Sequence, residues 1–325
     1  MGHKIILDCD IGIGGALALS YAMAQPDIDL IGICTSYGKV SAQNALRNAA
    51  YLCALAGRHI PVAQGAHVPL RKDAMAPDVD QEGEDGLGDT PDRQPLSYPP
   101  VNESGPRFIV EQARLAPGEV TVVTLGPLTT LSEAHRQEPR LHELLKHVVV
   151  LGGTITHMGN VSPVAESNIW HDPLAADQIL TSGMPLTLIP LDVSESIVIT
   201  TAQMRSIAGR QLHPLTELLA QATAKSAAYG AEQDDDLAEQ EAFWAHEIAP
   251  VIYVLRPDWF TIQEGRVRVA VNGVAEGQTI MDRNEKRQFA QPGWEPHIPK
   301  IQVALQTQPD RVIAEFQRAL KSTWI

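Results

Sequence analysis

The stretch Lys4–Leu19, KIILDCDIGIGGALAL, contains the parts of a strand, a turn and a helix in direct succession. Its apolar start predicts a buried strand, Asp8 and Asp10 stand where that strand ends, and a glycine-rich turn leads into a segment rich in Ala and Leu. Parallel strands need a long crossover connection, which is usually a helix. The stretch therefore predicts an α/β fold and places two carboxylates at a strand end.

The same rhythm repeats along the first 200 residues of this 325-residue chain. The runs that predict strands are apolar on both faces, as buried parallel strands are: Lys4–Asp8, Leu30–Thr35, Val120–Leu125, His147–Leu151 and Leu186–Leu191. The predicted helices are Ala16–Ala24, Ala42–Ala56, Leu128–His135, Pro173–Ser182, Leu212–Tyr229 and Glu239–Val254. These patterns predict one domain over residues 1–325, with a mostly parallel central sheet flanked by helices.

Four further segments complete the prediction. Ala76–Pro106, rich in Pro, Gly and acidic residues, and the acidic run Tyr229–Glu241 are predicted to be loops over the strand ends, either lids or solvated excursions. The alternation in GRVRVAVNG, from Gly265, predicts a peripheral strand. Asp310–Leu320 predicts a closing amphipathic helix.

Composition narrows the class of protein. A formal net charge of -14 without a long basic stripe argues against nucleic acid as a partner. No apolar run is long enough to span a membrane, and the N-terminus lacks the pattern of a secretory signal, so a cytoplasmic protein is expected. The odd number of cysteines, each beside an apolar segment, predicts reduced thiols and no disulfide framework.

Polar residues that follow parallel strands are the first candidates for a site, because ligands bind beyond the carboxyl ends of such strands. The richest such segment is Gly152–Asp177, in which Asn160, Glu166 and Asn168 are predicted to bind the hydroxyls of a sugar-like ligand. Asn160 and Asn168 have a structural alternative, since asparagine side chains also hold turns. Asp172 before Pro173 is predicted to cap a helix.

Aromatic and histidine side chains near these segments have less specific meanings. Trp170, Phe243 and Trp244 are candidates for stacking on a base, although the core is the more common place for such residues. His157 and His171 flank the loop with the three polar candidates and are interpreted as hydrogen-bonded neighbours.

The chain resembles the inosine-uridine nucleoside hydrolase family from end to end. The resemblance lies in KIILDCDIGIGGALAL, EGEDGLGD, VTLGPLTTL, VVVLGGTI, GNVSPVAESNIWHDPLAADQILTSGMPLTLIPLDVS and AHEIAP, in the family's order. It implies the family's fold, the hydrolysis of a nucleoside or related N-glycoside, and assembly into homodimers or homotetramers. It also implies that Asn160, Glu166 and Asn168 bind the sugar and that His246 protonates the departing base.

The resemblance breaks down in the motif that holds calcium in the family. Members carry a DTDPGIDDA-type motif, and its paired aspartates correspond here to Gly14 and Gly15. The family's Asn after the second strand, its HG loop and its HDP motif correspond to Lys39, Glu82-Gly83 and His246-Glu247-Ile248. The remaining ligands implied are Asp8, Asp10, the carbonyl of Leu125 and Glu247. Because calcium affinity depends on the number of charged oxygens, a weak or vestigial calcium site is expected, with no other cofactor.

Two roles for Lys39 are compatible with this pattern. Its ammonium group could partly replace calcium by pairing with Asp10 and Glu247 and holding substrate, or it could point to solvent as most lysines do. In a hydrolase of this kind Asp10 would be the general base on water and His246 the general acid.

Two further functions stay open. The chain could be a catalytically silent member of the family that binds a nucleoside or a sugar-like ligand. It could also cleave a modified nucleoside or another N-glycoside, with the base site reshaped by its long loops.

Overall fold

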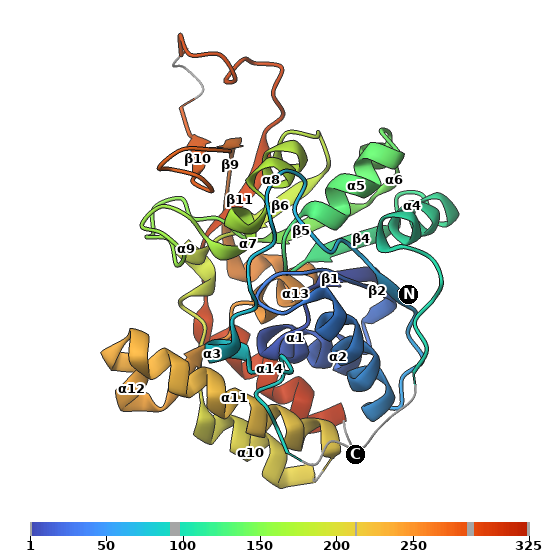
Figure 1. The fold of residues 1–325 in the computed structure, drawn as a ribbon, viewed down its shortest axis with the longest axis vertical. Helices are drawn as coiled ribbons and strands as arrows, with labels where there is room; N and C mark the ends of the chain where they lie inside the picture. The colour runs from blue at the N-terminus through green and yellow to red at the C-terminus, as the bar shows by residue number, and fades with distance from the viewer. Residues whose placement is uncertain (1, 92–97, 212, 285–288, 324–325) are drawn as a thin grey trace.

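The computed structural model describes residues 2–91, 98–211, 213–284 and 289–323, and a nine-stranded sheet runs through its middle (Figure 1). The strand order is β10-β9-β11-β6-β5-β4-β1-β2-β3, and every pair from β3 to β11 is parallel. The antiparallel pairs β11–β9 and β9–β10 form one edge. The strands are β1 (His3–Cys9), β2 (Ile28–Thr35), β3 (Val62–Gln64), β4 (Val120–Thr124), β5 (His147–Leu151), β6 (Leu186–Ile189), β9 (Phe260–Val269), β10 (Thr279–Asp282) and β11 (Ile301–Thr307). The mostly parallel α/β prediction is confirmed.

Helices cover both faces of the sheet. One core contains α1 (Ile13–Ala24), α2 (Ala42–Leu55), α13 (Ile248–Leu255) and α14 (Pro309–Thr323). The opposite core contains α4 (Gly105–Leu115), α5 (Thr129–Gln137) and α8 (Pro173–Leu180). An outer group of helices lies beyond α1: α11 (Pro214–Gln233) packs against α1, and α10 (Thr201–Gln211) and α12 (Asp235–Gln240) pack against α11. The short helices are α3 (Val79–Glu82), α6 (Leu141–Leu144), α7 (Ser167–His171), α9 (Leu191–Ser194) and the 3₁₀ turn η1 (Pro257–Trp259).

The five predicted parallel strands and the closing helix are present, with small differences at their ends. Helix α1 begins at Ile13, three residues before the predicted Ala16. The reason is long-range, because the Ile13 N–H donates to Glu82 Oε2 at 2.7 Å, so a side chain from α3 satisfies a donor of the first turn. The strand predicted over Leu186–Leu191 ends at Ile189, and α9 follows.

Two predictions in the acidic region are wrong. Tyr229–Glu241 is not a loop, because α11 runs to Gln233 and the Asp234 side chain accepts from the N–H groups of Asp236 and Leu237 to start α12. The helix predicted over Glu239–Val254 is interrupted, since Glu241 adopts φ 49° and ends α12. A two-stranded sheet of β7 (Val198–Thr200) and β8 (Ala242–Trp244) follows before α13. The predicted start of α11, Leu212, lies outside the described residues.

Cysteines and helix hydropathy agree with the sequence analysis. Cys9, Cys34 and Cys53 are buried free thiols. In the described part of the chain, no helix is both long and apolar enough to cross a bilayer.

Candidate active site

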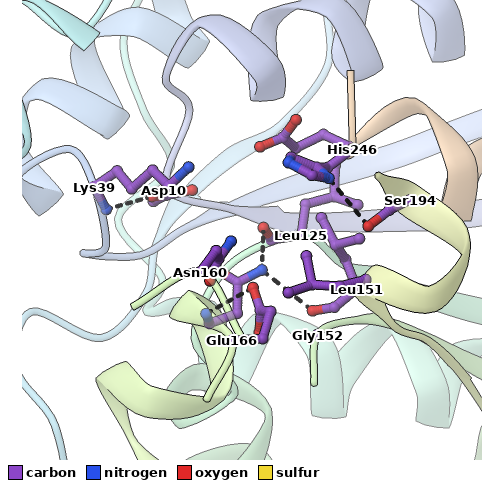
Figure 2. A pocket seen from close by; sticks show the side chains of 12 residues that line it. Asp10, Lys39, Leu125, Leu151, Gly152, Asn160, Glu166, Ser194 and His246 are labelled. Carbon is purple, nitrogen blue, oxygen red and sulfur yellow. Dashed lines mark hydrogen bonds between the residues drawn. The ribbon is translucent and has the colours of Figure 1, made fainter. Parts of the chain in front are cut away.

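A small inner pocket lies at the carboxyl end of the sheet, where β1, β4, β5 and β6 stop (Figure 2). Its volume is about 20 Å³, enough for one water molecule. It is lined by Asp10, Lys39, Leu125, Leu151, Gly152, Asn160, Glu166, Asn168, Leu191, Ser194, His246 and Glu247. The structure thus brings together every predicted site residue except Asp8, Gly14 and Gly15.

Asp10 and Lys39 form one side of this pocket. The Lys39 backbone N–H donates to Asp10 Oδ2 at 2.7 Å, and the lysine side chain extends past Asp10 toward the pocket centre instead of into solvent (Figure 2). Burial raises the pKa of Asp10, while the charges of His171 and Lys39 oppose that rise.

The ammonium group of Lys39 lies in a strongly negative environment. Burial alone would lower the pKa of Lys39, but Glu247, Glu82 and Asp10 outweigh it and raise that pKa. Among the described residues, the ammonium group makes no direct ion pair with Asp10 or Glu247. These carboxylates raise its pKa by electrostatic attraction without direct contact. The Lys39 ammonium therefore lies near these carboxylates without a contact pair, and its replacement of calcium stays a prediction.

The predicted sugar-binding residues are held mainly by backbone groups. Glu166 is the N-cap of α7, and its carboxylate accepts from the N–H groups of Gly153, Asn168 and Ile169 at 2.9, 2.9 and 3.1 Å. Asn168 Nδ2 donates to the carbonyls of Leu125 and Leu151 at 3.0 and 3.2 Å (Figure 2).

Asn160 shares this arrangement, because its Oδ1 accepts from the Ser167 N–H at 2.9 Å. The side chains thus fix the conformation of the loop, and all three border the pocket, where binding of a sugar stays a prediction. Asp172 caps α8 through the Ala175 N–H at 3.0 Å, as predicted.

His246 lies across the pocket from Asn160, with its Nδ1 3.0 Å from Ser194 Oγ (Figure 2). Burial and the positive charge of Lys39 lower the pKa of His246 to about 3. The imidazole is therefore neutral at physiological pH, whereas a general acid must carry a transferable proton there. This environment disfavours the general-acid role predicted for His246.

Other groups fill the space beside the two glycines. A Cβ atom at position 14 would lie 2.1 Å from Oε2 and 2.3 Å from Cδ of Glu247. A Cβ at position 15 would lie 2.6 Å from the sulfur of Cys9. The carboxylate of Glu247, the N-cap residue of α13, thus occupies the space into which a side chain on α1 would project.

Two more buried carboxyl groups lie near the inner pocket. Burial and the charge of Asp10 raise the pKa of Asp8 to about 8, while a hydrogen bond with the Thr130 side chain opposes that rise. Asp8 does not border the pocket, so its predicted role as a metal ligand gains no support. Burial likewise raises the pKa of Glu82 to about 8.

The donor set does not fit a calcium ion. In the described part of the chain, no three carboxylate, imidazole or thiol groups converge as metal ligands. Leu125 offers its carbonyl to Asn168, Asp10 Oδ2 is engaged by Lys39, and a cationic side chain borders the same small space. Calcium takes six to eight oxygens, and a neighbouring ammonium opposes its charge.

A larger outer cavity of about 850 Å³ adjoins the inner pocket, and Lys39, Asn160, Leu191 and His246 border both. This volume suits a nucleoside-sized ligand. Trp170 and Trp244 line the cavity, whereas Phe243 is buried in the core.

Sequence reasoning missed several residues of the two cavities. Ser194 was overlooked because a serine in a short helix carries no motif. His171, interpreted as a hydrogen-bonded neighbour, lies in α7 with its Nδ1 2.6 Å from the Ser167 carbonyl oxygen, and it borders the outer cavity. The predicted acidic loop does reach the outer cavity, through Tyr229, Gln233 and Asp234, although it does so as helix.

Comparisons with known proteins agree with this architecture. Residues 5–314 match the family model described as inosine-uridine preferring nucleoside hydrolase. The probable uridine nucleosidase 2 of Arabidopsis thaliana is 35% identical over 95% of both chains. The pyrimidine-specific ribonucleoside hydrolase RihA of Klebsiella pneumoniae is 31% identical over 87% of this chain and 89% of its own.

Solved structures give the same result. A plant nucleoside hydrolase superposes with a TM-score of 0.92 at 30% identity, over 99% of this chain and 100% of its own. A purine-preferring ribonucleoside hydrolase from Gardnerella vaginalis superposes with a TM-score of 0.87 at 28% identity, over 99% of both chains.

Proposed function

Because the chain belongs to the inosine-uridine preferring nucleoside hydrolase family, an enzyme family that cleaves N-glycosidic bonds of nucleosides, we propose that it performs this hydrolysis without a bound calcium ion. The observation that carries the proposal is the Glu247 carboxylate in the space beside Gly14, with Lys39 bordering the same pocket. In this proposal, the positive charge that a calcium ion would supply to the pocket comes from the ammonium group of Lys39.

The inner pocket supplies the nucleophile in this proposal. One water fits there beside Asp10, whose carboxylate is held by the Lys39 N–H. Asp10 takes one proton of this water while the water oxygen attacks the anomeric carbon. The carbon–nitrogen bond breaks, and its electron pair passes to the base, which leaves as an anion and takes a proton from solvent. An ammonium group acidifies water less than a divalent cation does, so a slower reaction or a more reactive substrate is expected.

The sugar is placed by the fixed loop at the opposite wall. Asn160, Glu166 and Asn168 border the pocket, and their backbone hydrogen bonds hold them without substrate. Preorganised groups of this kind lower the cost of orienting the substrate. The neutral His246 contributes a hydrogen bond and not a strong acid.

Hydrolysis of uridine and inosine, followed by chromatography before and after dialysis against EDTA, tests the proposal. Turnover should be unchanged by EDTA and by added calcium, and Asp10→Asn should lower kcat about 10²- to 10⁴-fold. The exposed Asp29 provides a matched control, because Asp29→Asn should leave turnover intact. Turnover that is lost with EDTA and restored by calcium contradicts metal independence.

One observation favours a second function, a nucleoside- or sugar-binding protein without turnover. The neutral state of His246 removes the general acid that would protonate a departing base. A thermal-shift series separates the two functions: stabilisation by nucleosides in EDTA, with no product formed, supports the binder.

A further inference from the structure

One lysine outside the two cavities contacts two distant segments of the chain. Lys72 lies between β3 and α3, and its Nζ donates to the Trp170 carbonyl oxygen at 2.5 Å and to Glu276 Oε1 at 3.0 Å. The same nitrogen lies 3.9 Å from the centroid of the Trp170 ring. An ammonium group has three N–H donors, so the carbonyl, the carboxylate and the face of the indole can each receive one.

The segments that Lys72 contacts meet at Trp170. Trp170 lies in α7, and Glu276 lies in the connection between β9 and β10. This connection approaches α7 closely, because Gly277 adopts φ 85° and a Cβ atom there would lie 3.0 Å from Trp170 Cα. Lys72 therefore links its own loop to α7 and to the β9–β10 connection at the point where these two touch.

Trp170 stands between Lys72 and the outer cavity. Trp170 lines that cavity, whereas Lys72 and Glu276 line a different space of about 250 Å³. Because the ammonium group covers one face of the indole, the rest of the ring is left to border the cavity. Lys72 does not border the outer cavity, so it acts on a ligand there through Trp170.

A second neighbour restricts the movement of the indole. The rings of Trp170 and His171 meet edge to face, with 6.0 Å between their centroids and 81° between their planes. His171 is buried, and its Nδ1 lies 2.6 Å from the Ser167 carbonyl oxygen, so this imidazole is itself fixed. The indole is thus held by an ammonium group over one face and by an imidazole ring beside it.

We propose that Lys72 is a positioning residue for nucleoside hydrolysis, which fixes the Trp170 indole as a wall of the outer cavity against which the base of the substrate packs. This inference rests on the proposed hydrolase function and adds a residue to it. Packing of the base on the indole is made by the bound substrate and by the transition state alike. A fixed indole therefore lowers KM and leaves kcat unchanged.

Two substitutions of Lys72 test the role of its charge. Lys72→Met keeps a long side chain and removes the charge and the donors, and KM for uridine should rise about threefold to tenfold with kcat within about twofold of the original. Lys72→Arg should restore most of the loss, because a guanidinium group also stacks on indole rings. Lys146→Met, the same change at an exposed lysine just before β5, should alter neither constant.

A double-mutant cycle tests whether Lys72 acts through the indole. Trp170→Leu removes the ring and should raise KM about threefold to tenfold. In that background, Lys72→Met should cause no further rise in KM, because the group that it positions is gone. Additive effects of the two changes, or a fall in kcat as large as the rise in KM, contradict the inference.

A milder variant guards against misfolding of Lys72→Met. Glu276→Gln removes the ion pair of the lysine and leaves the lysine in place. It should raise KM in the same direction by a smaller factor, and it should also lose this effect in the Trp170→Leu background. A KM for Glu276→Gln that changes equally in both backgrounds refutes a role through the indole.

Equilibrium binding separates this inference from the function beneath it. Calorimetry with uridine gives Kd for the four proteins of the cycle without turnover. If none of them cleaves uridine but Kd shows the same coupling, the hydrolase function fails and the positioning of Trp170 by Lys72 stands. If the unaltered protein cleaves uridine and Lys72→Met has the same KM and Kd, the hydrolase stands and the inference fails. A protein that neither cleaves nor binds uridine refutes both.

Discussion

Gly14→Ala tests whether the Glu247 carboxylate fills the space beside position 14. Gly14 lies in the first turn of α1, and a Cβ there would approach Glu247 Oε2, Cδ and Oε1 to 2.1, 2.3 and 2.6 Å. Overpacking of this kind typically costs about 1–3 kcal/mol. Replacing glycine by alanine inside a helix contributes about 1 kcal/mol in the opposite direction. Gly14→Ala should therefore destabilise the protein by about 0–2 kcal/mol.

The same change should reverse sign once the carboxylate is gone. In the Glu247→Ala background the overlap is absent, so Gly14→Ala should stabilise by about 1 kcal/mol. The coupling energy of the double-mutant cycle is then about 1–3 kcal/mol, well above the roughly 0.5 kcal/mol scatter of independent sites. Urea unfolding followed by circular dichroism measures the four proteins, and equal m-values justify the comparison.

Gly209 supplies the matched control. It lies in α10, and a Cβ added there would have no neighbour within 4 Å. Gly209→Ala should stabilise by about the same amount with or without the Glu247 carboxylate. Additive effects of Gly14→Ala and Glu247→Ala would refute the idea that one side chain fills the space of the other.

Three more predictions concern single side chains. The pKa of Glu82 is about 8 in the folded protein, against an ordinary pKa of 4.5. Its contribution to stability is therefore full below pH 4.5 and is lost as the pH rises toward 8. Glu82→Gln should make Tm depend less on pH over this range. The pH profile of kcat/KM should lack a limb near pH 6.5, and a limb there that disappears in His246→Gln would contradict the neutral imidazole. Asp172→Ala removes the carboxylate that accepts hydrogen bonds from the Ala175 N–H, the Leu70 N–H and the Thr129 hydroxyl. It should lower the free energy of unfolding in urea by about 1–3 kcal/mol, and Asp172→Asn should lower it by less.

The parallel sheet could be predicted because its strands are continuous apolar runs followed by turn residues, a pattern that depends only on local sequence. The region after Tyr229 could not. The acidic residues there read as a solvated loop, yet Asp234 caps α12 and the left-handed Glu241 ends it. The short β8 strand pairs with β7, which lies about forty residues earlier in the chain. Local sequence patterns do not predict pairing between segments so far apart.

The candidate site was predictable in membership but not in geometry. Strand-end position and family resemblance predicted that Asp10, Lys39, Asn168 and His246 lie in one site, and all four border the inner pocket. Which atoms face each other depends on long-range packing: the carbonyls that bind Asn168 come from two strands, and the Lys39 side chain turns inward because surrounding carboxylates stabilise its charge.

At three glycines, an added Cβ atom would overlap a carboxylate group: that of Glu82 at Gly12, of Glu247 at Gly14 and of Asp10 at Gly38. This arrangement links each glycine to the acid that faces it. A side chain added at position 14 requires the Glu247 carboxylate to shift or to be replaced by a smaller group, and the same holds at positions 12 and 38 for Glu82 and Asp10. Substitutions on the two sides of each pair are therefore expected to depend on each other.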